Sequence, residues 1–383
     1  MSFSPWPSIL SQASQPEPAP SAPSNDPELI AKLVKICGRG PMQDLVGNLD
    51  ASMDVTQAGG IHMPVSLSSG RNCYICDPGT AYIDYAIEET RHFTTKPWVQ
   101  KPLLGLIAAC RPLLALARLD HQVQANNWLF STNPVPPLTQ QSVAALRDDM
   151  IQAHHDRAIV IRSLNAMADN SSIDALKGAG FALLPSRQIY VLDPAADQSS
   201  KPDIKRDAKL LADSPYRIVP AASFSANDFS RAEQLYNMLY LDKYTQLNPH
   251  YTASFLAQAH QIGLLEIIGL RGPDDQLDGV IGLFSNGNTM TVPILGYDIS
   301  KPQETGLYRM LNSLGQQRAA KTQQFYNMSA GAASFKRHRG AVATIEYTAV
   351  YVRHLKWRQR IATRVIKALL TTIGVRVLRR FAL

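Results

Sequence analysis

The chain has 383 residues, of which 45% are apolar and 18% charged, and a formal net charge of +7. This composition excludes a largely disordered chain, and the length is too great for one ordinary core, so we expect two folded domains. Because nine Lys and Arg but no Asp or Glu follow residue 346, the first 346 residues carry a net charge of −2, and this distribution argues against a DNA-binding domain.

Residues 1–27 are predicted to be a disordered, proline-rich tail. Four prolines lie between residues 16 and 23, and no basic segment precedes an apolar run, so the features of a signal peptide are missing. Four cysteines in the whole chain are too few for a disulfide-rich module. We therefore expect a cytoplasmic protein.

Cys73 and Cys76 have the CxxC spacing that redox and zinc sites use. No second pair of ligands follows them, and residues 72–76 read as a strand, in which residues three apart point to opposite faces. We therefore expect buried packing in a hairpin and no metal site.

Residues 28–195 are predicted to form a first α/β domain. The expected helices cover 27–48, 140–154 and 172–179, and the expected strands cover 62–67, 72–76, 81–87, 158–162 and 188–192. The turn sequences Ser-Ser-Gly and Asp-Pro-Gly separate the first three strands. The apolar segment 103–119 fits either a buried strand or a helix, because its period is ambiguous.

Residues 196–215 are polar and charged, and we expect them to connect the two domains, with part of the segment helical. A second α/β domain is predicted over 216–356. Its expected helices cover 229–239, 251–261, 306–320 and 331–339, and its expected strands cover 264–270, 279–284, 289–295, 324–328 and 344–353.

Both halves end in a strand, a short helix and a strand, about 160 residues apart, which indicates an internal duplication; two unrelated α/β modules are the alternative. The order of elements resembles a GNAT acyltransferase domain, and the duplicated arrangement resembles the tandem FemAB-like group, which includes aminoacyl transferases of peptidoglycan bridges. Residues 327–351 carry the closest local match. The resemblance implies an α/β fold of two tandem GNAT-like domains, with mixed, mostly antiparallel sheet and flanking helices.

The segment before the central helix of the second domain departs from that family. Members that use acetyl-CoA bind its pyrophosphate on a glycine-rich loop at this helix start. Residues 297–310 contain a single glycine, Gly306, with Lys301 and Arg309 nearby. The resemblance implies acyl-CoA or an acyl carrier protein as donor, with these three residues receiving a phosphate; a plain helix cap is the alternative.

The closing strand 344–351 has two faces that follow from the alternation of its side chains. Thr344, Glu346, Thr348 and Val350 share one face, and Ile345, Tyr347, Ala349 and Tyr351 share the other. Glu346 is the one carboxylate of this strand. It is predicted either to accept a proton from the attacking amine or hydroxyl, or to form an ion pair with Lys336, Arg337 or Arg339.

Lys336, Arg337, His338 and Arg339 place four basic side chains on one helical turn. Consecutive residues of a helix point about 100° apart, so these four cannot share one partner. Lys336 and Arg337 are predicted to meet an acidic group of the substrate, and a solvated basic face is the alternative. Tyr347 is a further predicted substrate contact.

Asn327 and Ser329 flank the strand end where a GNAT-like fold opens between two central parallel strands. They are predicted to hold a thioester or acceptor carbonyl, and capping of the next helix by Ser329 is the alternative. Tyr297 and Asp298 occupy the facing position. Tyr297 is a predicted substrate contact, and Asp298 is either a catalytic base or the start of a turn.

Four polar residues of the first half lie at the corresponding places, namely Arg162, Asn165, Arg187 and Gln188. They include no acid–base pair. The first half is therefore expected to be structural or to shape the substrate cleft.

Residues 357–383 are predicted to form a basic amphipathic helix, with Ile361, Val365, Leu369 and Ile373 on one stripe. The longest uncharged stretch, 368–375, has eight residues and is too short to span a bilayer. Such a helix either lies on an anionic membrane surface or packs as a cap on the second domain.

These features predict a cytoplasmic acyltransferase, peripheral on the inner membrane if the C-terminal helix binds it. The expected reaction moves an acyl group from a thioester to an amine or hydroxyl by direct attack, because no Cys or Ser lies in a nucleophile motif. The expected acceptor is a small molecule or a lipid-linked group. The alternatives are a Fem-like transferase that uses aminoacyl-tRNA and a catalytically silent GNAT-fold binding or scaffold protein.

Overall fold

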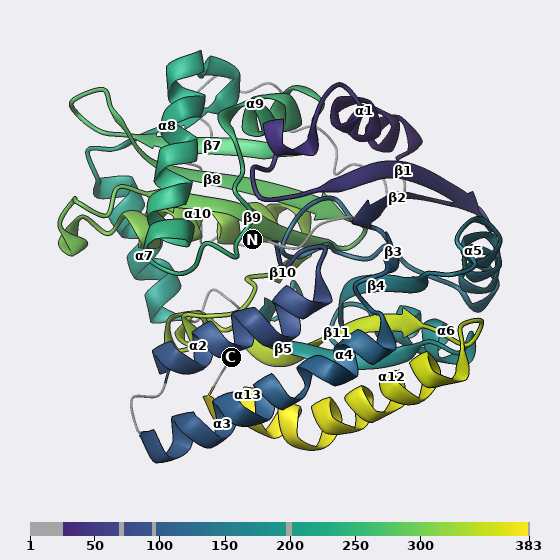
Figure 1. Ribbon diagram of the computed structural model, residues 1–383. Helices are drawn as coiled ribbons and strands as arrows, with labels where there is room; N and C mark the ends of the chain where they lie inside the picture. The colour runs from purple at the N-terminus through teal and green to yellow at the C-terminus, as the bar shows by residue number, and fades with distance from the viewer. Residues whose placement is uncertain (1–25, 69–72, 94–96, 197–200, 382–383) are drawn as a thin grey trace.

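The computed structural model describes residues 26–68, 73–93, 97–196 and 201–381, so the predicted tail lies almost entirely outside the described residues. The described strands form one mixed sheet in the order β1-β2-β3-β4-β11-β5-β10-β9-β8-β7-β6 (Figure 1). The strands are β1 (Ala51–Ala58), β2 (Ile61–Ser68), β3 (Gln122–Ala125), β4 (Ala158–Asn165), β5 (Ala182–Leu192), β6 (Arg217–Pro220), β7 (Glu266–Arg271), β8 (Leu277–Asn286), β9 (Thr289–Tyr297), β10 (Phe325–Asn327) and β11 (Val342–Tyr351).

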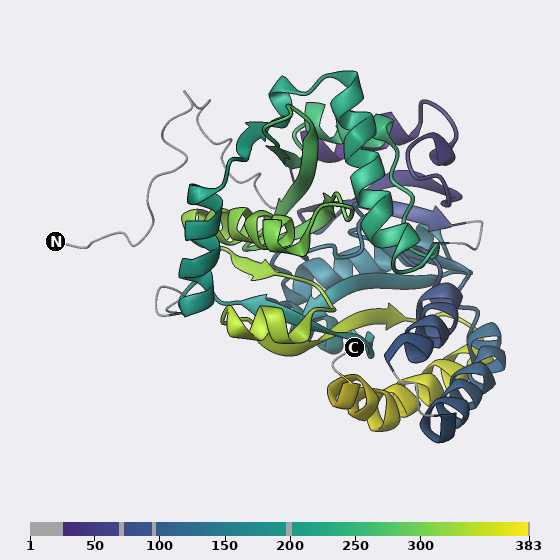
Figure 2. The same cartoon turned by 90° about the vertical axis from the view of Figure 1, so that its left-hand side faces the viewer.

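Helices cover both faces of this sheet (Figures 1 and 2). The helices are α1 (Pro27–Cys37), α2 (Tyr85–Phe93), α3 (Pro97–Ala109), α4 (Arg111–Ala117), α5 (Gln140–Ala153), α6 (Asn170–Gly178), α7 (Pro202–Asp213), α8 (Ala226–Asn237), α9 (Ala253–Gln261), α10 (Leu307–Thr322), α11 (Ala333–His338), α12 (Trp357–Leu369) and α13 (Val375–Phe381). Two single turns of π-helix, η3 (Thr80–Asp84) and η7 (Leu370–Gly374), lead into α2 and α13.

The predicted repetition is present in the strand pairing. In the first half β1, β2 and β3 are antiparallel and β4 runs parallel to β3; in the second half β7, β8 and β9 are antiparallel and β10 runs parallel to β9. Helices α5 and α10 connect the parallel pairs, and α6 and α11 precede the closing strands β5 and β11. Each half therefore has the same order of these strands and connecting helices, although α2, α3 and α4 are inserted between β2 and β3 of the first half.

The two closing strands are exchanged between the halves. β11 pairs with β4 of the first half, β5 pairs with β10 of the second half, and β5 and β11 pair with each other, all antiparallel. Each half thus supplies a strand that satisfies the backbone hydrogen bonds of the other. The two halves therefore share one continuous sheet.

Two predicted strands are wrong. Residues 73–77 form a turn instead of the strand predicted over 72–76, and the strand predicted over 81–87 is helical, as η3 and the start of α2. The Asp77 carboxylate accepts hydrogen bonds from the backbone N–H of Gly79 (2.9 Å) and Thr80 (3.2 Å) and from the Thr80 hydroxyl (2.6 Å). A carboxylate in this position caps a helix, so the Asp-Pro-Gly sequence starts a helix here and not a hairpin.

The ambiguous segment 103–119 is helical and belongs to α3 and α4, and α7 fills most of the predicted connection. Four apolar clusters hold the layers together. One packs α5 and α6 on the first half of the sheet, and another packs α4 and α12 on the opposite face. In the second half, α8 and α9 pack on one face and α10 on the other; α1, which contacts β1 and β2, belongs to the same apolar cluster as α8 and α9. Burial of these apolar side chains is the main stabilising contribution.

Candidate active site

A cavity of about 250 Å³ lies between the central strands and the helices α2, α3, α4, α12 and α13. Its polar floor comes from neighbouring strands: Gln122 and Gln124 on β3, Arg162 on β4, Glu346 and Thr348 on β11, and Ser186 and Arg187 on β5. Its walls are largely apolar and belong to the helices. Because β11 lies between β4 and β5, the exchange of closing strands brings residues of both halves to one floor.

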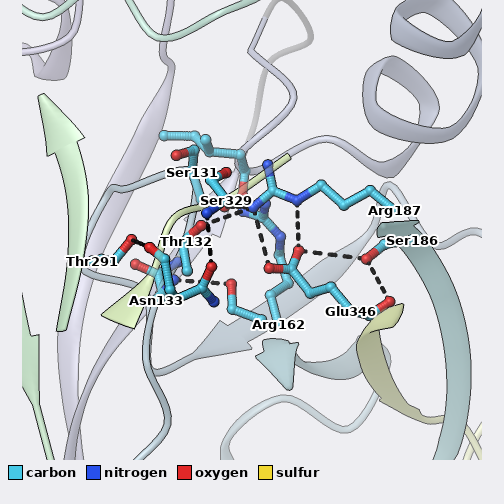
Figure 3. A network of polar contacts seen from close by, with 12 residues as sticks. Ser131, Thr132, Asn133, Arg162, Ser186, Arg187, Thr291, Ser329 and Glu346 are labelled. Atoms are coloured by element: carbon cyan, nitrogen blue, oxygen red, sulfur yellow. Dashed lines mark hydrogen bonds and ion pairs between the residues drawn. The ribbon is translucent and has the colours of Figure 1, made fainter. Parts of the chain in front are cut away.

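An ion pair between the two halves lies at the centre of this floor. Arg187 Nε is 2.9 Å from Glu346 Oε1, and Arg187 Nη2 is 3.2 Å from Oε2, so the contact is bidentate (Figure 3). The Glu346 side chain is 3% exposed and that of Arg187 is 21% exposed. Ser186 also donates to the Glu346 backbone carbonyl at 3.0 Å. Such fork-to-fork contacts fix both position and orientation of the two side chains.

Two guanidinium groups hold the loops above the floor. Arg187 Nη2 donates to the Ser131 carbonyl (3.0 Å) and to the Thr132 hydroxyl (2.8 Å), and Arg162 donates to the carbonyls of Ile75 (2.5 Å) and Ser131 (3.2 Å) (Figure 3). Arg187 Nη1 donates no hydrogen bond to any described residue. The first half therefore shapes the cleft, as expected, and also supplies its cations.

Glu89 is a carboxylate that the sequence reasoning missed. It lies on α2, lines the cavity, and has no hydrogen bond or ion pair with a described residue. Burial raises the pKa of Glu89 to about 7, although the positive charge of Arg187 opposes the rise. Tyr82, Ala86 and Glu89 all line the cavity at helical spacing. This spacing of three cavity-lining residues is the sequence feature that could have predicted a helix here, instead of a strand over 81–87, and with it the place of Glu89.

A buried amide also faces the cavity without a partner. The side chain of Gln124 is 1% exposed, and neither its oxygen nor its nitrogen has a hydrogen-bond partner among the described residues. Gln122 donates to the Cys76 carbonyl at 2.8 Å, but its side-chain oxygen has no partner there either. Buried polar groups are nearly always satisfied, so these atoms indicate a bound polar ligand or water.

The thiol nearest the floor is not an activated nucleophile. Cys76 lies in the 73–77 turn and lines the cavity, and burial raises the pKa of its thiol. Asn127 donates to its sulfur at 3.2 Å. Burial likewise raises the pKa of Cys73. Both thiols are therefore protonated at neutral pH, as is usual for structural cysteines.

The predicted assignment of faces on the closing strand is confirmed for residues 346–351. Glu346 and Thr348 line the cavity, and Val350 packs in the apolar cluster beneath α4 and α12. Tyr347 and Ala349 belong to the cluster on the opposite face of the sheet. Tyr347 consequently points away from the cavity.

Lys336 is buried and holds a backbone turn. Its ammonium lies 2.6 Å from the carbonyls of Met328 and Ala330 and 3.2 Å from that of Ser329. Burial, aided by the charge of Arg187, lowers the pKa of Lys336 to about 7. The alternative in which Lys336, Arg337 or Arg339 pairs with Glu346 is wrong, because Arg187 of the first half takes that place.

Asn327 and Ser329 lie next to this turn. Asn327 Oδ1 accepts from the Ser329 backbone N–H at 2.9 Å, and Thr291 donates to the Asn327 carbonyl at 3.1 Å. Figure 3 draws Ser329 close to the Arg187 network. The alternative role of Ser329 as a helix cap is wrong, because Ala332 precedes α11 and makes no side-chain cap.

The other predicted residues do not line the cavity. Asp298 follows β9, pairs with Arg231 at 2.6 Å and accepts two hydrogen bonds from Ser300. Burial raises the pKa of Asp298, but these contacts outweigh burial and the pKa is lowered. The ring of Tyr297 lies beside that of Tyr308, tilted by 52°, with ring centroids 6.0 Å apart. Arg337 is exposed and donates only within its own helix, to a carbonyl 3.3 Å away.

Helix α7 covers the start of α10, where the family resemblance implied a phosphate. Arg309 Nε is 2.7 Å from Asp207 Oδ1, Arg339 Nε is 2.6 Å from Oδ2, and Asp207 is fully buried. Lys301 pairs with Asp278 at 3.1 Å and with Asp274 at 3.5 Å. A pyrophosphate here would have to displace acidic groups of the chain itself, so the residues present do not fit that group.

Gly306, which ends the turn before α10, is expected to be sensitive to substitution. Its φ is +72°, and a Cβ atom would lie 2.5 Å from Leu210 Cδ2 of α7. Gly306→Ala is expected to lower the free energy of unfolding by about 1–3 kcal/mol, measured by urea denaturation. Gly331→Ala is the matched control, because its φ is +75° and nothing lies within 4 Å. An equal loss in both variants would contradict the contact with α7.

Comparison with known proteins finds no matching protein family and no matching curated protein. Solved structures do match. FemX is 8% identical with a TM-score of 0.49, over 89% of this chain and 98% of that chain. L-PGS from Bacillus licheniformis is 10% identical with a TM-score of 0.47, over 90% and 98%. A tandem GNAT protein from the clavulanic acid biosynthesis pathway is 10% identical with a TM-score of 0.37, over 86% and 96%.

Each of these TM-scores is below 0.5, so the conclusion rests on the strand order and the repeated helix positions. The chain is an α/β protein of two halves that repeat one order of strands and share one mixed sheet, an arrangement that resembles tandem GNAT-like domains.

Proposed function

We propose that the chain is a transferase that moves an acyl or aminoacyl group to a hydroxyl or amine in the cavity above Arg187 and Glu346. The observation that carries this proposal is Glu89: a carboxylate with a pKa of about 7 lines the same cavity as a buried amide without a described partner and a guanidinium held by an ion pair. Bases with a pKa near the working pH are the most effective in proton transfer, and perturbed carboxylates concentrate at active sites.

In the proposed reaction, Glu89 takes the proton of the acceptor hydroxyl or amine as its oxygen or nitrogen attacks the donor carbonyl carbon. The carbonyl π pair moves to oxygen, and Arg187 Nη1 and the Gln124 amide stabilise the resulting negative charge. The oxyanion then collapses, the bond to the leaving sulfur or oxygen breaks, and Glu89 returns its proton to the leaving group. Glu346 holds Arg187 in place through the bidentate contact and acts as a positioning residue.

The state of the lining thiols favours direct attack over a covalent enzyme intermediate. Two thiols line the cavity, Cys76 and Cys110, and burial raises the pKa of both; a protonated thiol is a poor nucleophile. The donor is proposed to enter through the cavity, because α7 covers the start of α10. The three candidate donors are acyl-CoA, an acyl carrier protein and aminoacyl-tRNA.

The test is a transfer assay with three labelled donors: acyl-CoA, acyl-acyl carrier protein and aminoacyl-tRNA. Each is incubated with the full chain and a cell extract that provides acceptors, and label is followed into organic and aqueous products. We expect one donor to give a labelled product with the parent protein and at least about 100-fold less with Glu89→Gln. No product with any donor, or equal product with Glu89→Gln, would support the silent scaffold instead.

A further inference from the structure

The outer part of the cavity is apolar on both sides. Leu103 and Ile107 of α3 face it from one side, and Leu369, Leu370, Val377 and Leu378 of α12, η7 and α13 from the other. Leu106 and Ile373 line the cavity and are also 40% and 39% exposed, so the apolar walls reach the surface between these helices. The cavity therefore runs from an exposed apolar mouth to the polar floor at Arg187 and Glu346.

The surface around this mouth is unusually apolar. Seven of the eleven exposed large apolar side chains in the described ranges belong to α3, α4, α12 and η7, among them Trp98 (74% exposed), Leu116 (48%) and Trp357 (64%). Ile361, Val365 and Ile373 of the predicted C-terminal stripe are exposed, while Ala362 and Ile366 are buried against α4. Helix α12 thus packs on the protein with one face and presents a second apolar face outward.

The same helices carry only positive charge. Residues 97–118 include three Lys or Arg and residues 356–381 include eight, and neither range contains Asp or Glu. Of these, Arg111 pairs with Asp84 of η3 at 2.6 Å. Figures 1 and 2 show these helices gathered at one end of the molecule, next to β5 and β11. Apolar side chains among basic ones are the pattern of helices that lie in the interface of an anionic bilayer.

We propose that α3, α4, α12 and α13 dock on an anionic membrane and that the cavity takes up an acyl chain of a lipid from it. The acyl chain lies between the helices, and the polar end of the lipid lies at the floor formed by Arg187 and Glu346. This inference rests on the proposed function, since it makes the lipid the substrate of that site. An acidic protein would match the charge, but the exposed Trp98 and Trp357 and the apolar mouth match acyl chains and the bilayer interface. No helix in the described ranges is long and apolar enough to cross a bilayer, so the contact is peripheral.

Docking is tested by vesicle flotation with the full chain. Vesicles of phosphatidylcholine with about one third phosphatidylglycerol are compared with pure phosphatidylcholine, each at low and high salt. We expect Arg376→Glu with Arg380→Glu to weaken binding to the anionic vesicles by about 30-fold or more. The control reverses two exposed lysines of α7, Lys205→Glu with Lys209→Glu, and leaves binding unchanged. Equal flotation on both vesicle types, or equal loss in both variants, overturns the membrane contact.

Chain uptake is tested by the fluorescence of cis-parinaric acid, a fatty-acid probe. Ile107→Trp and Leu370→Trp fill the apolar part from opposite sides, and both are expected to reduce probe binding at least about 10-fold. At least one of these two variants should keep the melting temperature and the vesicle binding of the parent protein, which shows that it is folded. Glu89→Gln should still bind the probe and the vesicles. Failure of the transfer assay can therefore be distinguished from failure of lipid uptake. Undiminished probe binding in both folded filling variants overturns the proposal.

Discussion

Glu89→Gln is expected to abolish most of the transfer activity while leaving the fold intact. The amide keeps the size of the side chain but cannot accept a proton from the acceptor, so kcat/KM should fall by about 10²- to 10⁴-fold. Glu88→Gln is the matched control, because Glu88 is the neighbouring residue of α2 and does not line the cavity. Similar kinetics of the two variants would remove Glu89 from the mechanism.

The pH dependence gives a second readout of the same residue. Glu89 must be ionised to act as a base, so kcat/KM of the parent should rise as the pH passes through about 7. The folded-state pKa lies above the ordinary value of 4.5, so between those two values the folded protein holds a proton that the unfolded chain has lost. The contribution of Glu89 to the free energy of unfolding should therefore fall as the pH rises from 4.5 to 7 and stay level above it.

Glu89→Gln removes that loss, and the variant should be more stable than the parent at pH 8 and equal to it at pH 4. A gain of roughly 1–3 kcal/mol in the free energy of unfolding is expected. Asp169, whose pKa burial also raises to about 7, contributes a loss of the same sign that persists in the variant. A parent and variant with parallel stability curves would contradict the burial of the Glu89 charge.

Glu346→Ala is expected to destabilise the protein by about 3–5 kcal/mol, because it leaves the Arg187 charge without its bidentate partner in a buried site. The measurement is urea denaturation followed by tryptophan fluorescence. The double variant Arg187→Met with Glu346→Leu should recover most of the loss, since apolar residues of similar size replace both charges. The activity should not return, because the carbonyl would lose its cation.

The surface ion pair of Arg217 with Asp275 provides the control. Its side chains are 63% and 75% exposed, so Asp275→Ala should cost about 1 kcal/mol or less. A loss for Glu346→Ala as small as this would mean that water in the cavity screens the pair.

The sequence determined the elements with strong local signals. The helix predicted over 306–320, the strands predicted on either side of the turn at Asn286 and Gly287, and the repeated strand–helix–strand endings all appear in the structure. Helical period and turn chemistry act within a few residues, so the local sequence is enough to predict them. It also determined the face of Glu346, since the side chains of a strand alternate. Asp77 shows the limit, because its carboxylate caps a helix where the turn sequence had suggested a hairpin.

The composition of the site depends on contacts between residues that are far apart in the sequence. Glu346 and Arg187 lie 159 positions apart and meet because the closing strands of the two halves are exchanged, a pairing that depends on long-range hydrogen bonds and leaves no local mark in the sequence. Glu89 enters the site because α2 folds over the sheet, and burial among apolar helices then raises its pKa. Local sequence patterns therefore predict the repeated fold. The partner of each charged side chain depends instead on which distant segments the fold brings into contact.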